Sequence, residues 1–339
     1  MEIIMKRNLT KGLFFFPLLL GLIPLTGCTK KENAITVAEV THSIFYAPMY
    51  VAKNAGYFEE EGIDVDIITT PGADKVMAAL ISKEADIGLM GPEATVYNYV
   101  NGNKDYAVNF AQLTQKDGSF ILGRDRIEDF SYEMLIGKTI IGGRKGGMPL
   151  MTLEHILREK GIEFGENDPS KDVNIRTDVS FDAMTGVFVA GESDFVTAFE
   201  PVATQVEKLG KGHILASLGQ DSGEIPYTCF SSLKSYMGKN EDKLVKFSRA
   251  IKKGLDFVHS NDIEAIIPYL SPDFTSSDQE ELTNVMSNYL SIEAWPKTPS
   301  FSEASFSKLV TIVKEAGELD SDAEVPFDKI VTDSILKQI

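Results

Sequence analysis

The most specific run in this chain is FYAPMYVAKNAGYFEEEGIDV, residues 45–65. Its apolar residues recur at helical spacing between Ala47 and Glu61, which predicts one amphipathic helix that packs by a single face. Gly62 is expected to end this helix, because a glycine in the left-handed conformation commonly closes helices. The β-branched run Val65–Thr70 then predicts a strand. The same alternation of strand and helix continues on both sides of this run.

The first third of the chain combines three strands with three helices. The predicted strands are Ile35–Val40, Val65–Thr70 and Ala85–Met90, and the predicted helices are Ala47–Glu61, Ala73–Ser82 and Pro92–Asn101. Pro92 is placed at the first helical position, where proline is favoured. The alternation predicts parallel βαβ units, with a sheet that helices cover on both faces.

The pattern restarts after residue 106. Ala107–Thr114 and Ser119–Gly123 are predicted strands without a helix between them, which indicates that the chain crosses there from one lobe to another. Ile214–Leu218 and Tyr227–Ser231 follow each other in the same way and indicate the return crossing. Between the crossings, strands are predicted at Thr139–Gly142, Val173–Arg176 and Asp194–Phe199, and helices at Pro149–Lys160 and Phe181–Ala190. After them, helices are predicted at Lys239–Ser260, Ile263–Leu270, Ser277–Ser291 and Ser302–Ala316.

This order of elements predicts an α/β fold of two lobes joined by two hinge crossings. Lobe one is expected to comprise residues 34–115 together with 226–339, including the C-terminal helices, and lobe two residues 116–225. Open α/β sheets bind ligands at the carboxyl ends of their strands. The cleft between the lobes is therefore the expected binding site, and hinge closure is the expected motion.

The run 45–65 resembles the first helix and second strand of the nitrate/sulfonate/taurine and thiamine-pyrimidine class of solute-binding proteins of ABC importers. ADIGLMG at 85–91 is similar to the third strand of that family, and DFVTAFEP at 194–201 to its lobe-two strand that ends in an acidic residue and proline. The resemblance implies the type II periplasmic-binding-protein fold, a small-molecule solute as ligand, and an ABC permease in the membrane as partner. It leaves the ligand open between a sulfonate-, nitrate- or taurine-like anion and a thiamine-precursor pyrimidine.

A leader with three basic residues precedes the apolar run Leu13–Ile23. This run is shorter than the roughly 20 residues that cross a bilayer as a helix, and it is typical of a secretory signal. Leu-Thr-Gly-Cys at 25–28 resembles the lipobox of bacterial lipoproteins. The resemblance implies that residues 1–27 are removed, that Cys28 carries a lipid anchor, and that residues 28–33 form a tether. The protein is then expected on the extracytoplasmic face of the cell membrane.

The composition is that of a globular protein, with 43% hydrophobic and 24% charged residues among 339. The formal net charge of −17 disfavours nucleic acid as a partner, and none is expected. The chain has two cysteines, and the lipid would occupy Cys28, so Cys229 is expected as a free buried thiol. We expect a monomer that uses no cofactor.

Candidate ligand contacts lie where predicted strands end and helices begin. They are His42, Ser43, Phe45, Tyr46, Gly72, Ala73, Gly91, Pro92, Glu93, Gly146, Gly147 and Met148. The resemblance adds Ser119 at the first crossing, where the hinge borders the ligand in that family, and Phe199 and Glu200 at the end of the stretch similar to the lobe-two strand. Backbone N–H groups at helix starts favour an anion. Glu200 and the aromatic residues favour a cationic or planar ligand such as an aminopyrimidine. The alternatives are that the glycines merely permit tight turns, and that Glu93 stabilises the start of its own helix.

No catalytic motif occurs in the sequence. The glycine-rich run 142–148 lacks the lysine and hydroxyl residue of a phosphate-binding loop, since Met148 and Pro149 stand in their places. The four histidines show no metal-ligand spacing, and Gly-x-Ser-x-Gly is absent. The sequence therefore indicates a receptor without catalysis and without a metal. Two alternatives stay open: a pyrimidine-synthase-like enzyme on the same fold, whose cysteine-rich iron motif this chain lacks, and a sensory solute-binding lipoprotein.

Overall fold

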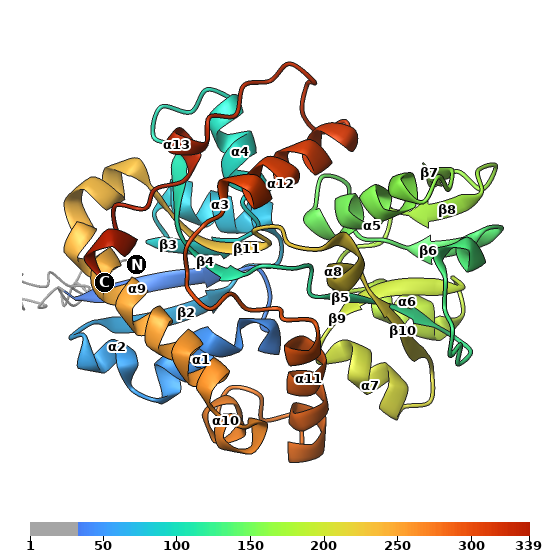
Figure 1. Ribbon diagram of the computed structural model, residues 1–339, viewed down its shortest axis with the longest axis horizontal. Helices are drawn as coiled ribbons and strands as arrows, with labels where there is room; N and C mark the ends of the chain where they lie inside the picture. Colours follow the sequence, from blue (N-terminus) through green and yellow to red (C-terminus); the bar gives the residue numbers. More distant parts are fainter. Residues whose placement is uncertain (1–32) are drawn as a thin grey trace, which may run out of the picture. The chain divides into compact units, whose positions relative to one another are not determined.

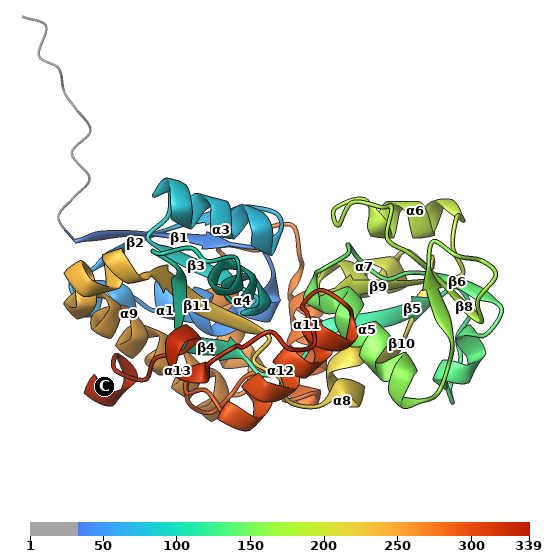
Figure 2. The same cartoon turned by 90° about the horizontal axis from the view of Figure 1, so that it is seen from above.

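The computed structural model describes residues 33–339, which form two mixed β-sheets with helices around them (Figure 1, Figure 2). The predicted leader, the lipobox and Cys28 lie outside the described residues. The predicted α/β class is confirmed.

The first sheet has five strands in the order β2-β1-β3-β11-β4. Strands β1 (Ala34–Glu39), β2 (Asp64–Thr69) and β3 (Ile87–Met90) are parallel. Strand β11 (Thr228–Leu233) runs antiparallel between β3 and β4 (Ala107–Thr114). Because β1 and β3 run the same way, their carboxyl ends meet at one edge of the sheet.

The second sheet has six strands in the order β10-β5-β9-β6-β8-β7. They are β5 (Ser119–Gly123), β6 (Lys138–Ile141), β7 (Phe164–Glu166), β8 (Val173–Arg176), β9 (Phe195–Phe199) and β10 (His213–Ser217). Strand β5 is antiparallel to both its neighbours, and the other pairs are parallel. The chain passes from the first sheet to the second between β4 and β5, and returns between β10 and β11.

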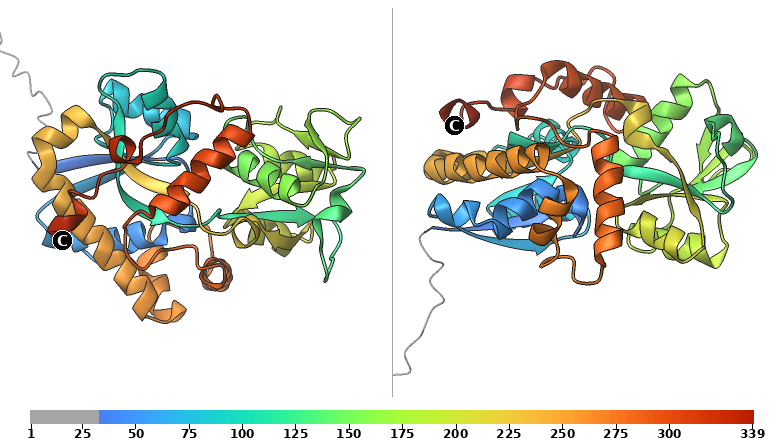
Figure 3. Two further views of the ribbon diagram at one scale, coloured as in Figure 1. Left: turned by 45° about the horizontal axis from the view of Figure 1, so that its top comes forward. Right: turned by 60° about the horizontal axis from the view of Figure 1, so that its bottom comes forward.

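Helices follow most strands, and a C-terminal group completes the fold. The helices are α1 (Ala47–Asn54), α2 (Tyr57–Glu60), α3 (Ala73–Ser82), α4 (Glu93–Val100), α5 (Met148–Glu159), α6 (Met184–Ala190), α7 (Val202–Lys208), α8 (Leu218–Ser222), α9 (Lys234–Ser260), α10 (Ile263–Leu270), α11 (Gln279–Ser291), α12 (Glu303–Glu315) and α13 (Phe327–Ile330). Short 3-10 turns lie at Ile44–Tyr46, Tyr132–Leu135 and Leu336–Gln338. Helix α11 contacts α7, and α12 contacts α5, so the C-terminal helices touch helices of the second sheet (Figure 3).

The prediction of one continuous helix over 47–61 is wrong. The structure divides it into α1 and α2 at Gly56, whose φ of 80° is left-handed and interrupts the helical backbone. Gly62, with a φ of 73°, follows the last turn of α2 and confirms the predicted end.

Two features near the predicted crossings and turns also differ from the prediction. Helix α8 lies on the return path, where no helix was predicted, and the Ser217 hydroxyl caps it by accepting the Gln220 N–H at 3.2 Å. Pro92 is the capping residue of α4, whose first helical residue is Glu93. The second difference concerns a helix start, where boundaries commonly vary by one or two residues.

The buried run Ala47–Ala52 of α1 packs directly against α9. A Cβ atom added at Gly254 of α9 would lie 2.1 Å from the carbonyl oxygen of Pro48. The two helices therefore approach at a point where only glycine fits. This packing fixes the start of α1, and with it the turn that follows β1.

Candidate functional site

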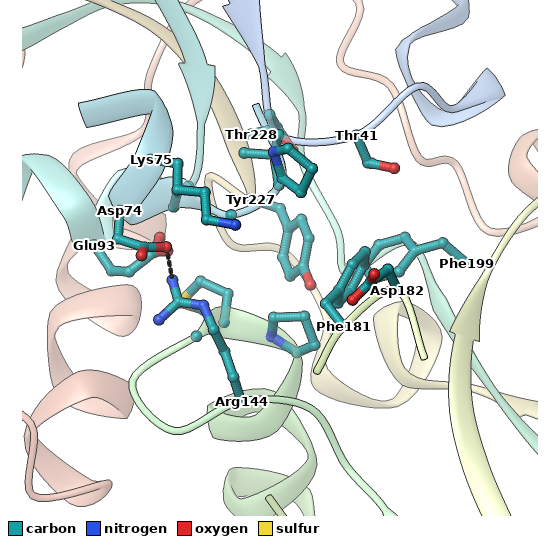
Figure 4. Close-up of a pocket in the computed structure, with 18 of the residues that line it drawn as sticks. Thr41, Asp74, Lys75, Glu93, Arg144, Phe181, Asp182, Phe199, Tyr227 and Thr228 are labelled. Carbon is teal, nitrogen blue, oxygen red and sulfur yellow. Dashed lines mark ion pairs between the residues drawn. The ribbon is translucent and has the colours of Figure 1, made fainter. Parts of the chain in front are cut away.

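A pocket of about 230 Å³, here called the main pocket, lies between the carboxyl-terminal edge of the first sheet and loops of the second (Figure 4). The first sheet contributes the turns after β1 and β3, the start of α3 and the start of β11. The second sheet contributes the β6–α5 loop, the segment before α6 and the end of β9. At roughly 30 Å³ per water molecule, the volume suits a small solute.

Charged side chains face each other across the main pocket. Asp74 Oδ1 on α3 lies 3.2 Å from Arg144 Nη2 of the β6–α5 loop. Hydrogen bonds from Ser180 and from its own backbone lower the pKa of Asp182, and the Lys75 ammonium of α3 lowers it further. Helix α3 thus contributes Asp74 and Lys75 to one wall. The opposite wall contributes Arg144 and Asp182. These charges balance in pairs.

Glu93, at the start of α4, is buried in the pocket wall with an incomplete set of hydrogen bonds. Its side chain is 3% exposed, and Oε2 has no hydrogen-bond partner among residues 33–339. Burial raises the pKa of this carboxyl to about 7, although its own backbone N–H and the Arg144 guanidinium favour the charged form. The carboxyl lies over Gly91, where an added Cβ would come 2.0 Å from Oε2. Glu93 therefore brings to the pocket wall a buried carboxyl with one oxygen that has no partner among the described residues.

Aromatic rings make up much of the remaining wall. Tyr46 and Tyr227 come from the side of the first sheet, and Phe181 and Phe199 from the side of the second. The ring centroid of Phe199 lies 5.9 Å from that of Phe181 and 6.3 Å from that of Tyr227. Burial raises the pKa of both tyrosine phenols, so they stay uncharged. With Met148, these rings suit a planar or apolar solute body.

The structure brings eight of the predicted contact residues together in the wall of the main pocket. They are Tyr46, Gly72, Ala73, Gly91, Glu93, Gly147, Met148 and Phe199. The other seven do not line it: His42, Ser43, Phe45, Pro92, Ser119, Gly146 and Glu200.

Glu200 lies outside the lining because its carboxylate is held within the fold. It accepts the backbone N–H and the hydroxyl of Thr204, each at 2.8 Å, and the side-chain amide of Asn288 at 2.7 Å. The carbonyl of Glu200 accepts the Ser43 hydroxyl at 2.7 Å. Ser43 and Glu200 therefore join the turn before α1 to the segment before α7.

His42 and Phe45 are also turned toward other parts of the fold. The His42 ring stacks on Phe274 at 4.5 Å between centroids, and its Nδ1 lies 3.2 Å from Glu39 Oε1. Phe45 is buried against Tyr289 at 5.0 Å between ring centroids. Both residues support the turn that carries Tyr46.

Three predicted contacts lie close to the main pocket without lining it. The Ser119 hydroxyl donates to Asp117 Oδ1 at 2.5 Å, on the path between the two sheets. Pro92 caps α4 beside Glu93. Gly146 lines a neighbouring chamber that is described below.

The main pocket is also lined by residues that were not predicted as contacts, among them Lys75, Asp182, Tyr227 and Thr228. Tyr227 and Thr228 were assigned to a buried strand, and their position at the end of the return crossing was the available signal. Lys75 and Asp182 carried no local signal, because each matters only once the chain has brought α3 opposite the segment before α6.

Three further features of residues 33–339 concern metals, cysteine chemistry and membranes. No group of three or more histidine, cysteine or acidic side chains in this part of the chain could hold a metal ion. Cys229 is free and buried, as predicted, and burial raises the pKa of its thiol. None of the helices in the described part is long and apolar enough to cross a membrane.

Comparisons with known proteins agree with this architecture. The family model described as NMT1/THI5 like matches residues 44–265. YtlA of Bacillus subtilis, a protein named as a binding protein, is 39% identical over 337 residues, 99% of each chain. THI13 of Saccharomyces cerevisiae, a 4-amino-5-hydroxymethyl-2-methylpyrimidine phosphate synthase, is 23% identical over 246 residues, 67% of each chain. The solved alkanesulfonate-binding protein SsuA from Xanthomonas axonopodis pv. citri, bound to MOPS, superposes with a TM-score of 0.70 over 88% of this chain and 98% of its own, at 14% identity.

Two sheets joined by two chain crossings, with a pocket lined from both, define a protein of the periplasmic-binding-protein fold. Within that class, the chain belongs to the NMT1/THI5-like family.

Proposed function

We propose that this protein is an extracytoplasmic solute receptor of an ABC importer, which captures a small polar solute in the main pocket. The observation that carries the proposal is a small pocket lined from both sheets, with a carboxyl oxygen in its wall that has no hydrogen-bond partner among the described residues. Residues 34–115 with 226–339 then act as one lobe and residues 116–225 as the other. Closure is a population shift, stabilised by contacts that exist only when both lobes touch the solute.

The proposed solute contacts are the eight predicted residues that line the main pocket, from Tyr46 to Phe199. Glu93 accepts a hydrogen bond from the solute, and the aromatic rings contact its planar face. A solute with N–H donors complements a buried carboxyl, whereas nitrate or a sulfonate would place a second acceptor against Glu93. This contrast favours a thiamine-precursor pyrimidine over an inorganic or sulfonate anion.

A lipid on Cys28 completes the proposal, because a receptor on the outer face needs to stay near its permease. Mass spectrometry of the mature N-terminus tests this step. We expect a chain that begins at Cys28 and carries acyl groups, and a Cys28→Ala chain that is released from the membrane. An unmodified Cys28 in the membrane-bound protein would contradict the anchor.

The resemblance to a yeast synthase supports a second interpretation as an enzyme on the same fold. The relative YtlA, which matches almost the whole chain at higher identity, is named as a binding protein and supports the receptor. A sensory lipoprotein would share the same capture chemistry. Normal uptake of the bound solute in a deletion strain would contradict the importer role and favour the sensor.

Isothermal titration tests the solute class directly. The titrants are 4-amino-5-hydroxymethyl-2-methylpyrimidine, taurine, methanesulfonate and nitrate. We expect saturable binding of the pyrimidine, and at least about tenfold weaker binding to Glu93→Gln, which corresponds to about 1.4 kcal/mol. Tighter binding of an anion than of the pyrimidine would contradict the proposed solute class.

A further inference from the structure

A second chamber of about 370 Å³, here called the side chamber, adjoins the main pocket. The two share Ala73, Asp74, Glu93 and Arg144 in their walls. The side chamber continues along α4 and the loop after it, and on its other side meets the β6–α5 loop and Glu318, which follows α12. The two spaces are therefore neighbours, with Glu93 in the wall of both.

Two carboxyl groups from different elements face this chamber. Glu93 is almost fully buried, with Oε2 unpartnered among the described residues. Glu318 is half-buried and forms no salt bridge within residues 33–339. An added Cβ at Gly146, across the chamber, would come 3.2 Å from the Glu318 Oε2 atom.

The phenol of Tyr97 shows that both carboxyl groups act on the same space. Burial raises the pKa of this phenol, and Glu93 and Glu318 raise it further through their negative charge, while Arg144 lowers it. Tyr97 Oη makes two long contacts, at 3.4 Å to the carbonyl oxygen of Gly146 and at 3.8 Å to the Met151 sulfur. The Tyr97 hydroxyl thus lies near both carboxyl groups, and its oxygen can still accept a hydrogen bond.

The basic residues of the chamber are already engaged by other acids. Arg144 pairs with Asp74 at 3.2 Å, and Lys145 pairs with Glu166 at 3.1 Å. After these pairs are subtracted, the Glu318 carboxylate and the ionised fraction of Glu93, whose pKa is about 7, leave an excess of negative charge in the wall. A bound anion would meet that excess, whereas a cation would neutralise it.

We propose that the side chamber is a cation subsite, which receives an ammonium or amidinium group of a solute whose planar body occupies the main pocket. The positive group donates to Glu93 Oε2 and to the Glu318 carboxylate, and the Tyr97 hydroxyl accepts a further N–H. Hydrogen bonds to charged groups are shorter and stronger than neutral ones. The inference rests on the proposed receptor function and adds a positive charge to the solute.

Matched planar probes test the subsite by isothermal titration of the purified protein. Benzamidine carries an amidinium, benzamide is its neutral isostere, and benzoate is the anion. We expect benzamidine to bind about tenfold more tightly than benzamide, which is the usual advantage of a charged over a neutral hydrogen bond. Benzoate should bind most weakly.

The variant Glu318→Gln separates charge from shape. We expect it to weaken benzamidine more than benzamide, and so to reduce the advantage of benzamidine over benzamide at least about fivefold. Glu324→Gln removes the same charge from an exposed residue outside both pockets and serves as the control. Its probe affinities should equal those of the wild type.

Two results would overturn the subsite while the receptor function stands. One is equal binding of benzamidine and benzamide, or tighter binding of benzoate. The other is a Glu318→Gln protein with an unchanged benzamidine advantage. Failure of all three probes at millimolar concentration would instead overturn the main pocket as a site for planar solutes, and the subsite with it.

Discussion

At the scale of single residues, Glu93 combines a cost to the fold with a use for recognition. Its carboxyl is removed from water, and one oxygen stays without a partner in the described part of the chain. Burial without compensating contacts destabilises the charged form of a carboxyl group. A solute that donates to Oε2 would supply the missing hydrogen bond. The same residue would then lower the stability of the empty protein and raise its affinity for the solute.

Glu93→Gln is expected to stabilise the empty protein at alkaline pH. The native carboxyl has a pKa of about 7, against 4.5 for an ordinary glutamate, so the native state binds more protons than the unfolded chain between these values. Stability from this group is present below pH 4.5 and is lost as the pH rises through about 7, by up to about 3 kcal/mol. The variant lacks this loss, so its Tm at pH 8 should exceed that of the wild type by several degrees.

Thermal unfolding followed across pH 4 to 9 checks this prediction. Glu128→Gln, a substitution of an exposed acid, is the matched control and should keep the pH dependence of the wild type. A Glu93→Gln protein whose Tm falls with pH as steeply as that of the wild type would show that Glu93 is not the titrating group.

The sequence predicted which residues reach the pocket wall where their position along the chain implied their position in the sheet. Glu93 and Gly91 were selected because they follow a predicted strand and open a helix, and the structure places both in the pocket wall. Glu200 was selected for its charge at the end of a strand that resembles the family's, but Thr204 and Asn288 hold its carboxylate away from the pocket. Which polar groups a neighbouring helix will bind is not visible in the local sequence.

At the scale of elements, the packing of α1 against α9 anchors the turn that carries Tyr46. The two helices come from distant parts of the chain and meet where Gly254 lies against the carbonyl oxygen of Pro48. Regular elements with clear periodicity were predicted with the bounds that the structure shows, as for α3, α10 and β4. The break at Gly56 was missed because a glycine inside a helical pattern is also compatible with a continuous helix.

Gly254→Ala is expected to destabilise the protein by at least about 2 kcal/mol. The added Cβ would lie 2.1 Å from a backbone oxygen, so one of the two helices would have to shift. Gly238→Ala lies on the same helix with nothing within 4 Å of the added Cβ, and it should be neutral or stabilise by up to about 1 kcal/mol. Urea unfolding of both variants measures the difference, and equal free energies of unfolding would contradict the close helix contact.

At the scale of the whole molecule, the charges across the main pocket are arranged in complementary pairs. Asp74 faces Arg144, and the Lys75 ammonium acts on Asp182. The Asp74–Arg144 ion pair joins α3 to the β6–α5 loop beside the second sheet. It can form only when the two sides are close, so it would stabilise the closure proposed above.

Charge reversal tests this role. Asp74→Arg and Arg144→Asp should each weaken binding of the pyrimidine a few fold, because like charges then face each other across the pocket. The double variant should recover most of the affinity, since the pair is restored in reverse. The effect is expected to stay near 1 kcal/mol, because both side chains are partly exposed to solvent. Losses that simply add in the double variant would show that the pair does not couple the two sides.

The two-sheet architecture was predictable because the periodic elements and the two helix-poor connections are local features of the sequence. The lining of the main pocket was only partly predictable. Tyr227, Thr228, Lys75 and Asp182 enter it through the relative placement of segments that are distant in the chain. No local pattern encodes that placement.

The most direct test of the central claim is a crystal structure of the protein with the solute that the titrations select. We expect the solute to lie in the main pocket, with its planar body against Phe181 and Phe199. An N–H donor of the solute should lie within hydrogen-bond distance of Glu93 Oε2. A solute bound elsewhere on the molecule, or bound in the main pocket without a donor to Glu93, would contradict the claim.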